Sequence, residues 1–151
     1  RAYNNLGNIY ALRNQLAEAA RYYALVLQID PGLAQVHSNL GNVLYKQGKV
    51  EEAIRCFHQA LALRPDLVEA WNNLGVALQK QEKYEEAIEA YRKALLYRPQ
   101  DTSPLVNLGN VYIRLGRREE AIRELERALQ ANPGFAPARA ALEKARQMAQ
   151  K

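Results

Sequence analysis

A strict 34-residue period runs through most of the chain. The tripeptide Asn-Leu-Gly occurs at 5–7, 39–41, 73–75 and 107–109, so that successive copies lie 34 residues apart. The same spacing separates four prolines and four alanines, which are Pro31, Pro65, Pro99, Pro133, Ala19, Ala53, Ala87 and Ala121. Because a fixed period of this length is the sequence signature of stacked supersecondary units, the chain is expected to be a repeat protein.

Each repeat carries two segments whose apolar residues recur at helical spacing. In the third copy Trp71 and Leu74 lie three residues apart, and residues 87–94 show the same periodicity on a second segment. A turn with proline separates consecutive repeats and stops the second helix. At the start of the fourth repeat, Thr102 or Ser103 is expected to cap the next helix.

The break between the two helices of a repeat favours residues that tolerate a left-handed backbone. Gly48 and Gly116 occupy this position in the second and fourth copies, and Asn14 occupies it in the first. The third copy has Glu82 there. We therefore expect a strained backbone at Glu82.

These marks resemble the tetratricopeptide repeat (TPR) family. The motif is present as Trp71-Asn72-Asn73-Leu74-Gly75, then Tyr84-Glu85-Glu86-Ala87-Ile88, then Tyr91, Ala94 and Pro99. The resemblance covers residues 1–135 and implies an all-α fold, a right-handed α-solenoid of helix–turn–helix units. The units would be 1–33 (truncated at its start), 34–67, 68–101 and 102–135. His37 departs from the family pattern, which usually has a large apolar or aromatic residue there.

Residues 136–151 do not begin a fifth repeat. Their apolar residues form one helical stripe, which consists of Ala138, Ala141, Leu142, Ala145 and Met148. We expect a single capping helix that covers the apolar face of the last unit. No such element precedes Arg1, so the chain is expected to be the C-terminal portion of a longer array.

In TPR proteins the first helix of each unit lines a concave groove, and asparagine dominates the corresponding positions here. Asn5, Asn39, Asn73 and Asn107 are equivalent in the four units. A second row contains Asn8, Asn42 and Asn110, and Tyr45 with the basic row Lys46, Lys80 and Arg114 completes the candidate site.

A primary amide offers two donor hydrogens and an acceptor oxygen, so it can bind both the C=O and the N–H of an extended peptide. The pattern is similar to that of the TPR superhelix of O-GlcNAc transferase, where such a ladder binds extended peptide. The alternative is that these amides bond to adjacent units.

Composition argues against catalysis and metal binding. The chain has one cysteine, Cys56, and two histidines, His37 and His58, which do not supply an ordinary four-ligand zinc site. We find no phosphate-binding glycine loop and no paired catalytic carboxylates. The sequence therefore predicts a protein that is not an enzyme, without a cofactor or a bound metal. A single cysteine fits a cytoplasmic or otherwise intracellular location.

The leading hypothesis is a protein–protein interaction scaffold that binds an extended peptide in the groove. One alternative is a substrate-recognition module of a larger enzyme such as a glycosyltransferase. A further alternative is a homo-oligomer formed through the N-terminal edge, where the candidate apolar residues are Tyr3, Tyr10, Tyr22, Leu25 and Leu27.

Nucleic acid is not expected as a partner, since residues 1–101 hold 12 Lys/Arg against 11 Asp/Glu and therefore lack the strongly basic surface of a nucleic-acid site. Membrane insertion is not expected either, because the uncharged stretches are too short.

Overall fold

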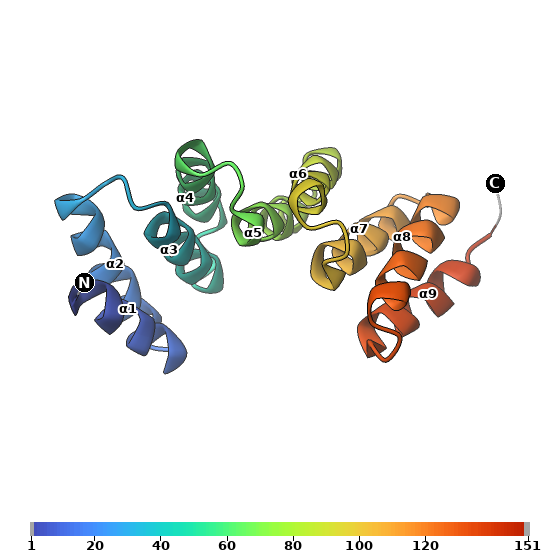
Figure 1. Ribbon diagram of the computed structural model, residues 1–151, viewed down its shortest axis with the longest axis horizontal. Coiled ribbons are helices and arrows are strands. Elements are labelled where there is room, and N and C mark those ends of the chain that lie inside the picture. The colour runs from blue at the N-terminus through green and yellow to red at the C-terminus, as the bar shows by residue number, and fades with distance from the viewer. Residues whose placement is uncertain (1, 150–151) are drawn as a thin grey trace.

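The computed structural model describes residues 2–149, which form nine α-helices and no strand (Figure 1). The first eight helices make four pairs: α1 (Ala2–Leu12) with α2 (Leu16–Ile29), α3 (Ala34–Lys46) with α4 (Val50–Leu63), α5 (Val68–Lys80) with α6 (Tyr84–Tyr97), and α7 (Thr102–Arg114) with α8 (Arg118–Ala131). The last helix, α9 (Ala136–Arg146), follows alone. The prediction of an all-α solenoid is confirmed. No helix within the described residues has both the length and the apolar content needed to cross a bilayer.

The helices form an inner and an outer layer. From the second unit onward the first helices of consecutive units touch one another, α3 with α5 and α5 with α7, and α7 touches the final helix α9 in the same way. Within residues 2–149 no comparable contact joins the second helices, α4 with α6 or α6 with α8. The first helices therefore line the side on which the units lie closest together, which is the inner side of the array.

A close crossing holds each pair together. A Cβ atom added to Gly75 would lie 2.5 Å from Cε1 of Tyr91, and one added to Gly41 would lie 2.8 Å from Cε1 of Phe57. Both rings are fully buried. The invariant Gly of the Asn-Leu-Gly motif is thus explained by the large side chain of the second helix that lies directly over it.

The turns inside the units have the predicted left-handed backbone. The φ angles are 82° at Gly48, 72° at Gly116, 58° at Asn14 and 61° at Glu82. An L-residue with a long side chain is unfavourable in this region, so Glu82 is the strained member of the set.

The predicted cap of the fourth unit is wrong. Asp101, not Thr102 or Ser103, is the N-cap of α7, and its carboxylate accepts a hydrogen bond from the Ser103 backbone N–H at 3.2 Å. The helix begins at Thr102, two residues earlier than a Ser103 cap would allow. An aspartate that precedes a helix can reach the N–H two residues further on, and this bond decides where the helix begins.

Each proline carbonyl between units accepts a side-chain donor. The bonds are His37 Nε2 to Pro31 (2.8 Å), Trp71 Nε1 to Pro65 (2.7 Å), Arg127 Nη2 to Pro99 (3.0 Å) and Arg139 Nη2 to Pro133 (3.1 Å). Three of these donors occupy the same position of the repeat. The departure at His37 therefore keeps the hydrogen bond that Trp71 makes one unit later.

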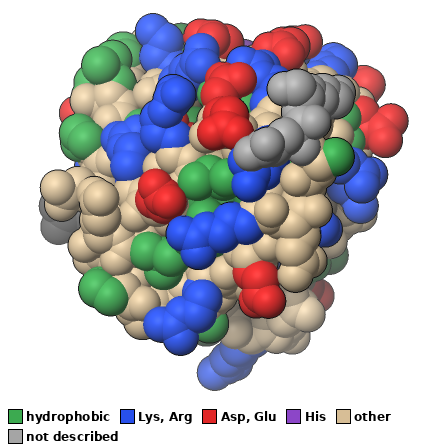
Figure 2. All heavy atoms as spheres, turned by 90° about the vertical axis from the view of Figure 1, so that its right-hand side faces the viewer, with side chains coloured by type: hydrophobic (Ala, Val, Ile, Leu, Met, Phe, Trp, Pro, Cys, Tyr) green, Lys and Arg blue, Asp and Glu red, His purple; other side chains and the backbone are tan. Residues whose placement is uncertain are grey.

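Helix α9 covers the end of the array. Ala138, Ala141, Leu142 and Ala145 are buried against the last unit, and α9 contacts both α7 and α8. The outer surface of this end carries intermixed basic and acidic side chains (Figure 2). Arg1 and residues 150–151, which belong to the predicted first unit and capping helix, lie outside the described residues.

The arginines near the C-terminal end pair with interleaved glutamates. Arg117 bonds Glu120 at 2.7 Å, and Arg127 bonds Glu124 at 2.6 Å. The hydrogen bond from Arg117 lowers the pKa of Glu120, with smaller contributions from neighbouring arginines. These arginines are therefore part of a mixed-charge helix face.

Candidate functional site

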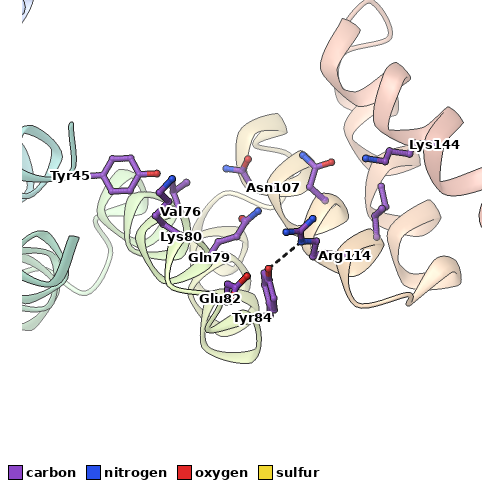
Figure 3. Close-up of a pocket in the computed structure, with 11 residues that line it drawn as sticks. Tyr45, Val76, Gln79, Lys80, Glu82, Tyr84, Asn107, Arg114 and Lys144 are labelled. Atoms are coloured by element: carbon purple, nitrogen blue, oxygen red, sulfur yellow. Dashed lines mark hydrogen bonds between the residues drawn. The ribbon is translucent and has the colours of Figure 1, made fainter. Parts of the chain in front are cut away.

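Two pockets lie along the inner side of the array. The first has a volume of about 410 Å3 and lies between α1 and α3; its lining includes Asn8, Asn39, Asn42 and Lys46. The second, of about 600 Å3, extends from α3 to α9 (Figure 3). Its lining includes Tyr45, Lys80, Asn107, Asn110 and Arg114. Every predicted groove residue except Asn5 and Asn73 lines one of these two pockets.

The first asparagine row makes few internal hydrogen bonds. Nδ2 of Asn107 donates to Oδ1 of Asn72, in the preceding unit, at 3.1 Å. Oδ1 of Asn39 accepts from Gln35, on the same helix, at 3.0 Å. Within residues 2–149 the half-buried side chain of Asn73 makes no hydrogen bond to another protein group. One amide of the row therefore links two units, and the others keep donor hydrogens available.

The second asparagine row is less engaged. Oδ1 of Asn8 accepts a 2.6 Å bond from the hydroxyl of Tyr23, and burial raises the pKa of that hydroxyl, so it remains a donor. Asn42 and Asn110 are exposed, and neither side chain makes a hydrogen bond to another of the described residues. Val76 occupies the equivalent position in the third unit, so this row is interrupted there.

Two tyrosines organise the larger pocket. The hydroxyl of Tyr84 accepts a 3.2 Å hydrogen bond from Nε of Arg114, as Figure 3 shows. The hydroxyl of Tyr91 donates to Oε1 of Gln79 at 2.8 Å. Burial, and to a lesser extent the nearby Tyr45, raises the pKa of Tyr91. Both contacts hold pocket-lining polar groups in place.

Several lining residues were not predicted. Gln79 occupies the same repeat position as Tyr45, so the repeat alignment contained a signal for it. Glu82 and Tyr84 come from the turn and the start of the second helix, whereas the residues predicted from the sequence all lie on first helices. Lys144 comes from α9, and its place in the pocket depends on how that helix docks.

The predicted N-terminal edge contains a tyrosine stack. The ring of Tyr22 lies 5.4 Å from Tyr10 and 6.1 Å from Tyr3, measured between ring centroids. Tyr3 is 47% exposed, and Tyr10 and Tyr22 are half-buried. The stacked rings therefore remain partly exposed to solvent at this edge, Tyr3 most of all.

The described part of the chain holds no arrangement of side chains that suits a metal ion. Within residues 2–149 no three His, Cys, Asp or Glu side chains come together at ligating distance. Cys56 is half-buried, and burial together with the neighbouring Glu52 raises the pKa of its thiol. The thiol is therefore protonated at neutral pH, unlike an activated nucleophile.

Family models account for most of the chain. A model described as TPR repeat matches residues 7–48 and 41–82, and two models of the tetratricopeptide repeat match residues 68–101 and 103–135. The chain belongs to the tetratricopeptide repeat family.

Solved structures share the whole architecture. A crystal structure of the MamA protein is 26% identical in sequence and aligns with a TM-score of 0.87. The alignment covers 95% of this chain and 79% of the MamA chain. A second crystal structure of MamA is 23% identical and aligns with a TM-score of 0.82. This alignment covers 94% of this chain and 93% of the MamA chain. A chain in the crystal structure of the APC/C hetero-tetramer Cut9–Hcn1 is 25% identical and aligns with a TM-score of 0.87. The alignment covers 95% of this chain but only 29% of the matched chain. No curated protein matches the sequence. The repeats and these relatives define the chain as a protein–protein interaction scaffold.

Proposed function

We propose that the inner face binds an extended polypeptide through the side-chain amides of its asparagine rows. The observation that carries the proposal is the uncommitted hydrogen-bonding capacity of Asn42, Asn73 and Asn110. These amides lie at repeated positions on the inner helices, and no hydrogen bond within residues 2–149 occupies them.

An extended peptide presents N–H and C=O groups at a regular spacing of about 3.3 Å per residue. A side-chain amide can donate to one such carbonyl and accept from one such N–H. Amides carried by identical units repeat along the array, so a chain laid across them meets the same pair of groups in each unit. Such binding depends on the peptide backbone and imposes little selection on side chains.

The amides of Asn39 and Asn107 each make one hydrogen bond within the protein and keep part of their hydrogen-bonding capacity for a ligand. Asn107 spends one of its two donor hydrogens on Asn72, and its oxygen remains available. Asn39 uses its oxygen and keeps both donor hydrogens. Both side chains serve structure in part and are still able to contact a ligand.

The test is peptide selection followed by titration. Unstructured peptides of about 12 residues, roughly 40 Å when extended, are selected from a displayed random library and titrated by fluorescence anisotropy. The triple variant Asn42→Ala/Asn73→Ala/Asn110→Ala should bind on the order of fivefold to tenfold more weakly for each amide removed.

These three positions are chosen because their removal breaks no internal hydrogen bond, so the variant is expected to fold as the parent does. Asn132→Ala, at the C-cap of α8, is the matched control and should leave the affinity unchanged. If the triple variant retains its circular dichroism spectrum and binds as tightly as the parent, the asparagine rows are not the binding site.

A further inference from the structure

We propose that the larger pocket is a subsite for an acidic side chain, Asp or Glu, of the bound polypeptide. The proposal rests on the proposed function, because the carboxylate belongs to the same extended ligand. Three basic side chains converge on the pocket from three helices, Lys80 from α5, Arg114 from α7 and Lys144 from α9. Figure 3 shows Lys144 pointing from α9 toward α7.

The two pockets differ in charge. The larger pocket has three basic side chains in its lining and one acidic side chain, Glu82. The smaller pocket has a single charged side chain, Lys46. A ligand that spans both pockets therefore meets an excess of positive charge at the C-terminal end of the groove, and complementarity favours acidic residues in that part of it.

The basic groups are available to a ligand. Within residues 2–149 none of Lys80, Arg114 and Lys144 forms an ion pair, whereas Arg117 and Arg127 do. Arg114 is also oriented, since its Nε donates to the Tyr84 hydroxyl. The two terminal nitrogens of its guanidinium group remain to bind a carboxylate.

The pocket also contains neutral donors. Asn107 and Asn110 lie in the lining with Arg114, on the same helix. Amide N–H groups can bind the second carboxylate oxygen or the adjacent peptide carbonyl. The asparagine rows and the basic groups therefore meet in this pocket, where backbone binding and side-chain selection are expected to act together.

The experiment compares peptides that differ in charge alone. Three peptides of one length, built on Ala, Ser and Thr, carry Glu, Gln or Lys at the same positions and are titrated by fluorescence anisotropy. Because each exposed ion pair contributes roughly 1.5-fold to 5-fold in affinity, the Glu peptide should bind about threefold to tenfold more tightly than the Gln peptide at low salt. The preference should shrink as salt rises from about 50 to 200 mM.

The variant Lys80→Gln/Lys144→Gln should reduce the Glu-over-Gln preference to less than about twofold, and this ratio is measured within the same variant. Lys49→Gln/Lys93→Gln removes the same charge from two exposed residues that do not line the pocket, and it should keep the preference. A preference that survives in the pocket variant, or that is lost equally in the control, overturns the subsite.

The two proposals fail in different ways. If the Gln peptide binds through the asparagines and the Glu peptide binds no better, the subsite is refuted and the proposed function stands. If none of the three peptides binds, and no library peptide does, both are refuted.

Discussion

Replacing Glu82 by glycine should stabilise the third repeat. Glu82 has a φ angle of 61°, and the equivalent positions in the second and fourth units are glycines. A left-handed backbone costs an L-residue about 1–2 kcal/mol. Glycine removes this cost but loses about 0.5–1 kcal/mol more conformational freedom on folding. The expected net gain in the free energy of unfolding is therefore about 0.5–1 kcal/mol, or roughly 1–4 °C in Tm for a chain of this length.

Two further variants separate backbone from charge. Glu82→Gln keeps the strained backbone and removes the charge, so it should leave the stability nearly unchanged. Gly48→Ala is the reverse test, because a Cβ there meets no atom within 4 Å and only the backbone is perturbed. It should cost about 1 kcal/mol.

The assay is urea unfolding followed by far-ultraviolet circular dichroism, with native-state hydrogen exchange to locate the change. Glu82→Gly should raise the transition midpoint and slow exchange in α5 and α6. A midpoint that falls or stays the same in Glu82→Gly, together with a neutral Gly48→Ala, would refute the argument that backbone strain resides in this turn.

Two other predictions concern packing and the turns between units. Gly75→Ala should lower the free energy of unfolding by about 1–3 kcal/mol, because its Cβ would lie 2.5 Å from the buried ring of Tyr91; equal stability in urea would contradict the packing argument. Trp71→Phe should lower it by about 0.5–1.5 kcal/mol through loss of the 2.7 Å bond to the Pro65 carbonyl, with faster exchange of the turn amides; exchange that does not change would show that this bond adds nothing.

The repeat architecture could be predicted because each of its causes is local and recurs every 34 residues. Gly75 is fixed by the ring of Tyr91 from its own unit, and Gly48 by a turn of its own unit. The same motif and turn residues recur in all four units, so the sequence is hard to reconcile with a fold other than stacked helical pairs. The strain at Glu82 followed from the same comparison of equivalent positions.

Features that depend on contacts between units could not be predicted in this way. Bonding of the asparagine amides to adjacent units was one of the two alternatives, but the period does not specify the relative placement of two repeats, so it could not indicate that Asn107 bonds to Asn72. Lys144 reaches the larger pocket because of the angle at which α9 docks. Arg127 bonds the Pro99 carbonyl from a different helix than the corresponding donors of the other units. Side-chain bonds of this kind differ from unit to unit, although the backbone repeats.

The central claim is that uncommitted asparagine amides on the inner face bind the backbone of an extended polypeptide. The most direct measurement is a titration of 15N-labelled protein with a library-selected peptide, in which the side-chain amide resonances of Asn42, Asn73 and Asn110 are followed by NMR. These resonances should shift progressively as the peptide binds, while that of Asn132 on the far end of α8 stays in place. Saturated peptide binding with all three inner amide resonances unmoved would contradict the claim.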